Sequence, residues 1–115
     1  MTDNFFPTGK FTYTVGEYSP IVDISGEGKM SMSLDREVLV VSKYQVTGDV
    51  LEVEDTEGSY AGPEFGVGKY RWKYSEGTLT FSLIEDKMSS RSKAFGVPWY
   101  EVDRSDMPYY MEGTS

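Results

Sequence analysis

Tyrosine, carboxylate and lysine side chains are the groups in this chain that could take part in proton transfer. The 115 residues include 9 tyrosines and 19 aspartates and glutamates, but no histidine and no cysteine. The absence of histidine excludes a histidine-based catalytic triad, a histidine general base and the commonest metal ligands. The absence of cysteine excludes a thiol nucleophile, a thiolate metal site and a disulfide framework. We therefore expect no cofactor, and any catalysis would depend on the remaining groups.

The acidic residues of the segment 49–57 are candidates for a divalent cation site. They are Asp49, Glu52, Glu54, Asp55 and Glu57. Their spacing lacks the EF-hand pattern of calcium ligands. We interpret them as a solvated acidic face and predict no metal site.

Charge and length limit the classes of partner. The chain is long enough for one domain with a substantial core, and 38% of its residues are hydrophobic. A formal net charge of -8 argues against nucleic acid and anionic membranes as partners. No apolar run approaches the roughly eighteen residues of a membrane span. We expect one β-barrel domain over residues 1–103 and a C-terminal tail over 104–115.

The N-terminal residues bear on localisation. Residues 1–10 lack the basic region and the apolar stretch of a signal peptide. A cytoplasmic protein is expected if the chain is full length, with a removed export signal as the alternative.

Alternating apolar and polar residues predict that most of the chain forms β-strands. Met30, Met32 and Leu34, for example, alternate with polar neighbours, which is the period of a half-buried strand. No segment has an apolar stripe of helical period with a cap at its start. We expect about eight strands, near residues 9–16, 20–25, 28–34, 37–47, 50–56, 67–75, 78–85 and 91–103.

Two hairpins with the same layout predict the register of the sheet. A turn at 48–49 would pair Val46 with Leu51, and Tyr44 with Val53. A turn at 76–77 would likewise pair apolar residues with apolar residues. Those second pairs are Tyr74 with Leu79, Trp72 with Phe81 and Tyr70 with Leu83.

A third hairpin, at Asp35, is predicted with a three-residue loop. It would pair Leu34 with Val38, and Met32 with Val40. All three hairpins then agree on one inner face. The sequence therefore predicts an all-β, antiparallel up-and-down meander that closes into a barrel.

The predicted inner face carries large side chains that could bind a ligand. They are Tyr13, Met30, Met32, Tyr44, Tyr70, Trp72, Tyr74 and Phe81. A packed core, with methionines filling irregular gaps, is one interpretation. A ligand cavity is the other, since an eight-stranded barrel has roughly room for one small ligand. The second hairpin presents three aromatics on one strand, so we expect any site to lie against it.

Arg91 and Trp99 complete the candidate ligand-binding residues. If the strand 91–103 were regular, Arg91 would share a face with Phe95, Val97 and Trp99. An inward arginine would bind a ligand carboxylate. The alternative is an exposed arginine at the start of the strand.

Three surface features have open interpretations. The glycine-rich segment 57–68 is either a lid over a barrel mouth, with Tyr60 and Phe65, or a solvated connector. The basic residues of the segment 69–73 either attract an anionic partner or balance acidic neighbours. Leu39 and Val41 are apolar on the predicted outer face, so the tail or a second subunit of a homodimer should cover them.

The chain resembles the calycin group, the lipocalin-like small barrels. Residues 68–72 (GKYRW) and 77–81 (GTLTF) are similar to segments of short bacterial lipocalin-like proteins, and 44–51 (YQVTGDVL) is similar to their preceding hairpin. The likeness runs from about Phe11 to Trp99, with Phe11 in place of the tryptophan of the lipocalin Gly-x-Trp motif. The resemblance implies an up-and-down barrel that binds an apolar or aromatic small molecule. A minority of barrels in this broad group are isomerases or cyclases.

Three functions therefore follow as hypotheses. The first is a binding barrel for an apolar or aromatic small molecule. The second is a cofactor-independent cyclase or isomerase that polarises its substrate with Tyr13, Tyr44, Tyr70 or Tyr74. The third is a structural or interaction domain with a filled core.

Overall fold

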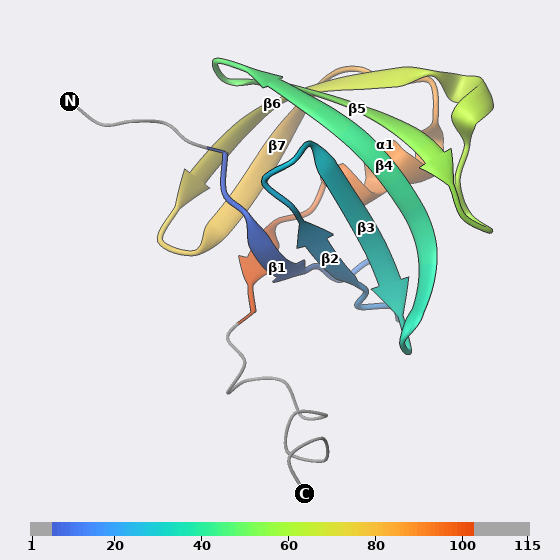
Figure 1. The fold of residues 1–115 in the computed structure, drawn as a ribbon. Coiled ribbons are helices and arrows are strands. Elements are labelled where there is room, and N and C mark those ends of the chain that lie inside the picture. The colour runs from blue at the N-terminus through green and yellow to red at the C-terminus, as the bar shows by residue number, and fades with distance from the viewer. Residues whose placement is uncertain (1–5, 103–115) are drawn as a thin grey trace, which may run out of the picture.

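The computed structural model describes residues 6–102 and shows a closed antiparallel β-barrel of eight strands (Figure 1). Each strand pairs with its neighbour in sequence, and β1 pairs with β8 to close the barrel. This confirms the predicted up-and-down fold. The tail predicted at 104–115 lies outside the described residues.

The elements are β1 (Gly9–Thr12), β2 (Ile21–Ile24), β3 (Lys29–Leu34), β4 (Glu37–Thr47), β5 (Val50–Glu57), the 3-10 helix η1 (Pro63–Phe65), β6 (Val67–Ser75), β7 (Thr78–Glu85), the helix α1 (Ser89–Phe95) and β8 (Trp99–Glu101).

The up-and-down order divides the connections between two ends of the barrel. The connections 13–20, 35–36, 58–66 and 86–98 lie at one end, which we call the α1 end because α1 belongs to it. The connections 25–28, 48–49 and 76–77 lie at the opposite end, together with Phe6 before β1. A side chain near the end of a strand is therefore assigned to one of these two ends.

The hairpins β4–β5 and β6–β7 have the predicted registers. Val46 pairs with Leu51, and Tyr44 pairs with Val53. In the second hairpin Trp72 pairs with Phe81. Glu76 and Gly77 both have positive φ, at 53° and 82°, as a two-residue turn compatible with strand twist requires.

The β3–β4 hairpin differs in part from its prediction. Met32 pairs with Val40 as expected, but Leu34 pairs with Glu37 and not with Val38. The reason is a two-residue turn in which Asp35 and Arg36 both have positive φ. A bulge after Met32 then restores the inward register. Because of this bulge, Leu39 is the unpaired residue of β4, and it is buried.

The first and last predicted strands are shorter than expected. β1 ends at Thr12, and an isolated bridge between Val15 and Tyr18 follows it. The strand predicted over 91–103 is wrong: α1 occupies Ser89–Phe95, and β8 contains only Trp99–Glu101. The helix has no side-chain cap at its start, so the usual sequence signal of a helix N-terminus is missing.

Most of the predicted inner face forms the core. The buried residues include Phe11, Tyr13, Met30, Tyr70, Trp72 and Trp99, and Met32, Tyr44 and Phe81 pack against them. Tyr74 pairs with Leu79 as predicted and its ring meets Phe11, but it is not buried: it is 36% exposed near the turn that joins β6 to β7. No helix within residues 6–102 has the length and apolar character needed to span a bilayer.

Candidate ligand-binding site

A cavity of about 130 Å³ lies inside the barrel at the α1 end. Tyr13 just after β1, strands β2 to β5, the 58–66 connection, α1 and β8 all contribute to its wall. Most of the wall is apolar, with the side chains Met30, Met32, Val40, Met88, Phe95 and Trp99. No residue of the segment 67–85 lines it, so this cavity does not lie against the second hairpin as predicted.

The aromatic wall of the cavity is built around Phe95. This side chain is the second buried residue of α1, four positions after Arg91, so both are on one face of the helix. Its ring stacks on Tyr70 at 4.5 Å and meets Trp99 at 4.9 Å between centroids. Trp99 in turn stacks on Tyr13 at 5.3 Å. These contacts attach the short helix to the barrel wall.

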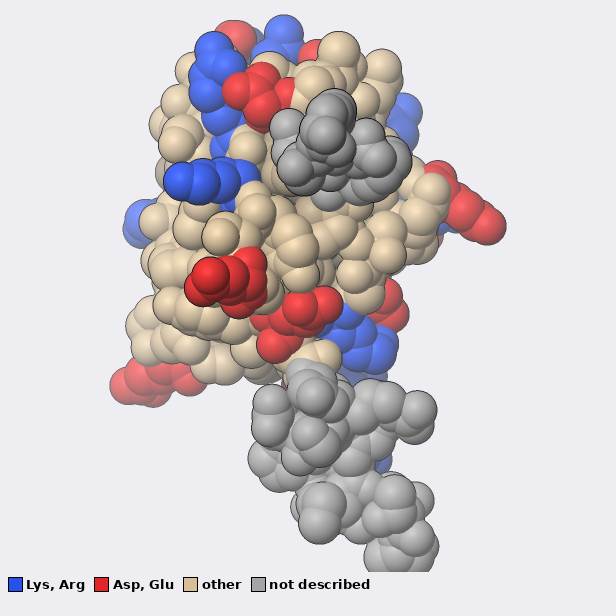
Figure 2. All heavy atoms as spheres, turned by 90° about the vertical axis from the view of Figure 1, so that its left-hand side faces the viewer, with Lys and Arg blue, Asp and Glu red and all other residues tan. Residues whose placement is uncertain are grey.

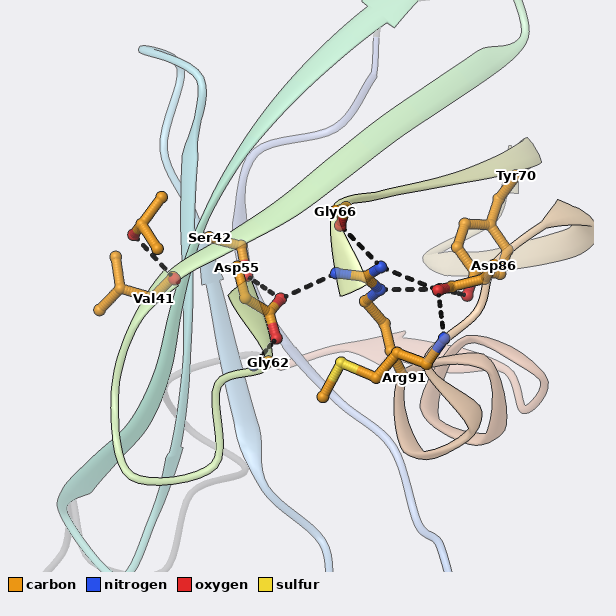
Figure 3. Close-up of polar contacts among 10 residues, drawn as sticks. Val41, Ser42, Asp55, Gly62, Gly66, Tyr70, Asp86 and Arg91 are labelled. Atoms are coloured by element: carbon orange, nitrogen blue, oxygen red, sulfur yellow. Dashed lines mark hydrogen bonds and ion pairs between the residues drawn. The ribbon is translucent and has the colours of Figure 1, made fainter. Parts of the chain in front are cut away.

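The polar wall of the cavity centres on Arg91, which α1 places between two carboxylates (Figure 3). Its Nη1 donates to Asp55 Oδ1 at 3.2 Å. On the other side, Nε and Nη2 donate to the two oxygens of Asp86 at 2.7 and 2.8 Å. Nη2 also donates to the carbonyl of Gly66 at 3.0 Å. The three charged side chains are at most 4% exposed, so they form a buried ionic network.

Each carboxylate in this network has further donors. Asp55 accepts hydrogen bonds from the Ser42 hydroxyl at 3.0 Å and the Gly62 N–H at 2.9 Å. Asp86 accepts from the Tyr70 hydroxyl and from the Met88 N–H. Buried charges require such complete pairing, because an unpaired one has a large desolvation cost. The network thereby ties α1 and the 58–66 connection to β4, β5 and β6.

Gly68 is buried beside this network, where no larger residue fits. A β-carbon at this position would overlap the Asp86 carboxylate and lie 3.1 Å from Arg91 Nε. The glycine of the segment GKYRW therefore provides the space in which the ion pair forms.

The network changes the pKa values of its members. Burial raises the pKa of Asp86, but hydrogen bonds from Arg91, Tyr70 and Met88 outweigh burial and hold it below its usual value. Burial lowers the pKa of Arg91, whereas Asp86 and Asp55 raise it by more, so the guanidinium stays charged. Burial, and then Asp86, raise the pKa of Tyr70 above its usual range.

The predicted ligand-binding residues are divided between this cavity and the rest of the core. Tyr13, Met30, Met32, Arg91 and Trp99 line the cavity. Tyr70 and Phe81 pack behind Phe95 without lining it. Tyr44, Trp72 and Tyr74 lie toward the opposite end of the barrel.

An aromatic cluster closes that opposite end. The Phe6 ring lies 5.3 Å from both Tyr44 and Trp72. The Tyr44 hydroxyl donates to the Ser25 carbonyl, and Trp72 Nε1 donates to the Gly48 carbonyl at 3.1 Å. The polar atoms of both side chains are thus bonded within the protein, which is a structural role.

Asp55 is the site residue that the sequence interpretation misplaced. The sequence predicts that Asp55 lies on a solvated acidic face, but its side chain is 3% exposed and lines the cavity. Its position repeats the inward alternation of Leu51 and Val53, and that alternation is the signal that could have found it. Within residues 6–102, acidic side chains do not gather into a group of three that could hold a metal ion.

The basic residues of β6 point outward beside carboxylates. Arg71 pairs with Asp49 at 3.1 Å, and Lys69 lies opposite Glu52 and Glu85 in the neighbouring strands. Figure 2 shows acidic and basic side chains interspersed on one face of the molecule. These observations favour charge balance over an anion-binding stripe.

The fold and site together define an eight-stranded antiparallel barrel with a small cavity beneath a short helix. No family model, curated protein or solved structure matches this chain.

Tyr13→Phe is expected to reduce the loss of stability at alkaline pH. Burial raises the pKa of Tyr13 to about 12, against about 10 in an unfolded chain. The unfolded state therefore releases this proton first. Between about pH 10 and 12, Tyr13 should lower the free energy of unfolding by up to about 1.4 kcal/mol per pH unit. Phenylalanine has no titrating proton, so the Tyr13→Phe variant lacks this contribution to the pH dependence of the free energy of unfolding.

Urea unfolding of the Tyr13→Phe variant and the wild type across this pH range measures the effect. Data near neutral pH serve as the control, because there the two proteins should differ only through the hydrogen bond from Tyr13 to Met32 Sδ. Parallel alkaline slopes in the two proteins would contradict the prediction.

Proposed function

We propose that this barrel binds one small apolar or aromatic molecule in the cavity at its α1 end, as a lipocalin-like binding protein. The single observation that carries the proposal is the cavity of about 130 Å³ inside a closed barrel. An apolar cavity of about 150 Å³ stays dry and holds benzene. The expected ligand is therefore about the size of one aromatic ring, with room for a substituent only toward the mouth.

The cavity wall supports an apolar ligand. Met30, Met32 and Met88 are unbranched and polarizable, so they can adapt to the shape of a bound ring. Trp99 and Phe95 provide flat aromatic surfaces for stacking.

The mouth of the cavity supports entry from the α1 end. Tyr60 lines the cavity and is 66% exposed, so it lies where the interior meets solvent. Its connection, 58–66, is rich in glycine, which is typical of segments that move when a ligand enters. Phe65, the other predicted lid residue, is exposed and does not line the cavity.

The tyrosine hydroxyls favour binding over the cyclase or isomerase hypothesis. Tyr44 and Tyr74 do not line the cavity, and the hydroxyl of Tyr70 donates to Asp86. Tyr13 lines the cavity, but its hydroxyl donates to Met32 Sδ at 2.9 Å. No observation specifically favours catalysis, so it is not part of this proposal.

Toluene is a suitable first probe, read out by NMR of ¹³C-labelled methionine methyl groups. We expect toluene to shift the methyl resonances of Met30, Met32 and Met88 in a saturable way and to raise the melting temperature. If toluene leaves all three resonances and the melting temperature unchanged, the proposal is wrong.

Val40→Phe is expected to weaken toluene binding by at least about tenfold, equivalent to about 1.4 kcal/mol. Val40 lines the cavity, and the larger ring would occupy the ligand space. Val46→Phe is the matched control, because Val46 shares the inward face of β4 but does not line the cavity. Equal affinities in the two variants would locate the binding elsewhere.

A further inference from the structure

We infer that the cavity selects an uncharged or cationic aromatic ligand and discriminates against carboxylates. The inference rests on the proposed function and adds the charge class of the ligand. It is carried by the buried network of Asp55, Arg91 and Asp86. Asp55 and Arg91 line the cavity, and Asp86 pairs with Arg91 behind them.

Arg91 has no bidentate face left for a ligand carboxylate. An arginine binds a carboxylate most strongly through two parallel N–H donors. The pair on Nε and Nη2 is already used by Asp86, and Nη2 also donates to Gly66 (Figure 3). On Nη1, one donor is used by Asp55. A ligand carboxylate would have to displace a buried aspartate from its partner.

The charge balance of the network also opposes an anion. Two carboxylates and one guanidinium leave one net negative charge inside the protein. Asp55 and Arg91 are the charged side chains that line the cavity within the described residues 6–102, so no lysine offsets this charge there. In a site of low dielectric constant, a second negative charge meets stronger repulsion than in water.

The aromatic wall of the cavity also disfavours an anionic ligand. The faces of aromatic rings carry negative electrostatic potential, which attracts cations and repels anions. Tyr13 and Trp99 stack at the cavity wall, with an interplanar angle of 16°. Trp99 also contacts Phe95 at 4.9 Å between ring centroids, so the wall presents several ring surfaces to a ligand.

Three probes of nearly equal shape test the inference: benzoate, benzamide and benzamidine, which are anionic, neutral and cationic. Each would compete with toluene in the methionine methyl assay. We expect benzamide and benzamidine to displace toluene, with benzoate at least about tenfold weaker than benzamide. The inference is overturned if benzoate binds as tightly as benzamide, or if toluene binds and none of the three probes displaces it. A failure of toluene itself would instead overturn the proposed function.

Asp55→Asn identifies the source of the discrimination. The substitution removes the negative charge at the cavity wall and keeps the shape of the side chain, so the preference for benzamide over benzoate should fall at least about threefold. Glu52→Gln is the matched control, because this substitution removes the same charge from the chain. Glu52 is on the outward side of β5, opposite Gln45 and Lys69. An equal change in both variants would contradict a role for the buried network. The wild-type probe series is decisive by itself if Asp55→Asn does not fold.

Discussion

Arg91→Met is expected to lower the free energy of unfolding by about 3–5 kcal/mol, the usual result of removing one partner from a buried ionic network. The substitution leaves Asp55 and Asp86 as neighbouring carboxylates with side chains at most 3% exposed. It also removes the donors that connect α1 to β5 and to the Gly66 carbonyl. A domain of this size is generally stable by only about 5–15 kcal/mol, so the loss should be visible as a large shift of the urea midpoint.

Arg71→Met is the matched control for this prediction. Arg71 also makes an ion pair with an aspartate, Asp49 at 3.1 Å, but its side chain is 61% exposed. A solvent-exposed pair contributes about 0–1 kcal/mol, so this variant should remain close to the wild type. Similar losses in the two variants would show that burial of the Arg91 network has little energetic importance.

Neutralising Asp55 and Asp86 in the Arg91→Met variant tests the physical cause of its lost stability. If the loss in Arg91→Met comes from unpaired buried charge, adding Asp55→Asn and Asp86→Asn should recover part of the stability. If it comes mainly from lost packing of the arginine stem, the added substitutions should make the protein less stable still.

Phe95→Ala is expected to destabilise the protein by about 3–5 kcal/mol, as is typical of a buried phenylalanine. The side chain is 5% exposed, and its ring contacts Tyr70, Phe81 and Trp99 with centroids 4.5 to 4.9 Å away. Phe95 is the aromatic residue of α1, and together with the smaller Ala94 it packs the helix onto the core. Urea unfolding followed by tryptophan fluorescence measures the loss, since Trp99 is among the contacts.

The same substitution should also enlarge the cavity, because Phe95 lines it. Toluene is therefore expected to raise the melting temperature of Phe95→Ala by more than that of the wild type. Phe65→Ala is the control: Phe65 is 39% exposed in η1, so its truncation should have a small effect on stability. If Phe65→Ala is as damaging as Phe95→Ala, the helix anchor is not the dominant contact.

The antiparallel pairing was predictable because it is encoded locally. In β4–β5, the alternation of apolar residues and a two-residue turn allow one register that keeps Tyr44, Leu51 and Val53 inside. A slip of one residue would expose this face and bury charge. The β3–β4 turn was only partly predictable, because positive φ at Asp35 and Arg36 has no glycine to signal it.

The helix α1 was not predictable by the same reasoning. It has seven residues, no side-chain cap and only two buried side chains, so its periodic signal is too short to recognise. Its stability comes from tertiary contacts: Phe95 packs among aromatic rings from three strands, and Arg91 pairs with Asp55, which is 36 residues away in sequence.

The sequence by itself determined the closed antiparallel barrel and most of its inner face, since a period of two and short turns act between neighbouring residues. It also supplied the chemical groups, in particular tyrosines and carboxylates without histidine or cysteine. Only the tertiary structure decided where those groups act. It buried Asp55, placed Arg91 on a helix between two carboxylates and put the cavity beneath α1. The physical reason is that a buried charge is stable only with partners, and here the partners come from segments far apart in the chain.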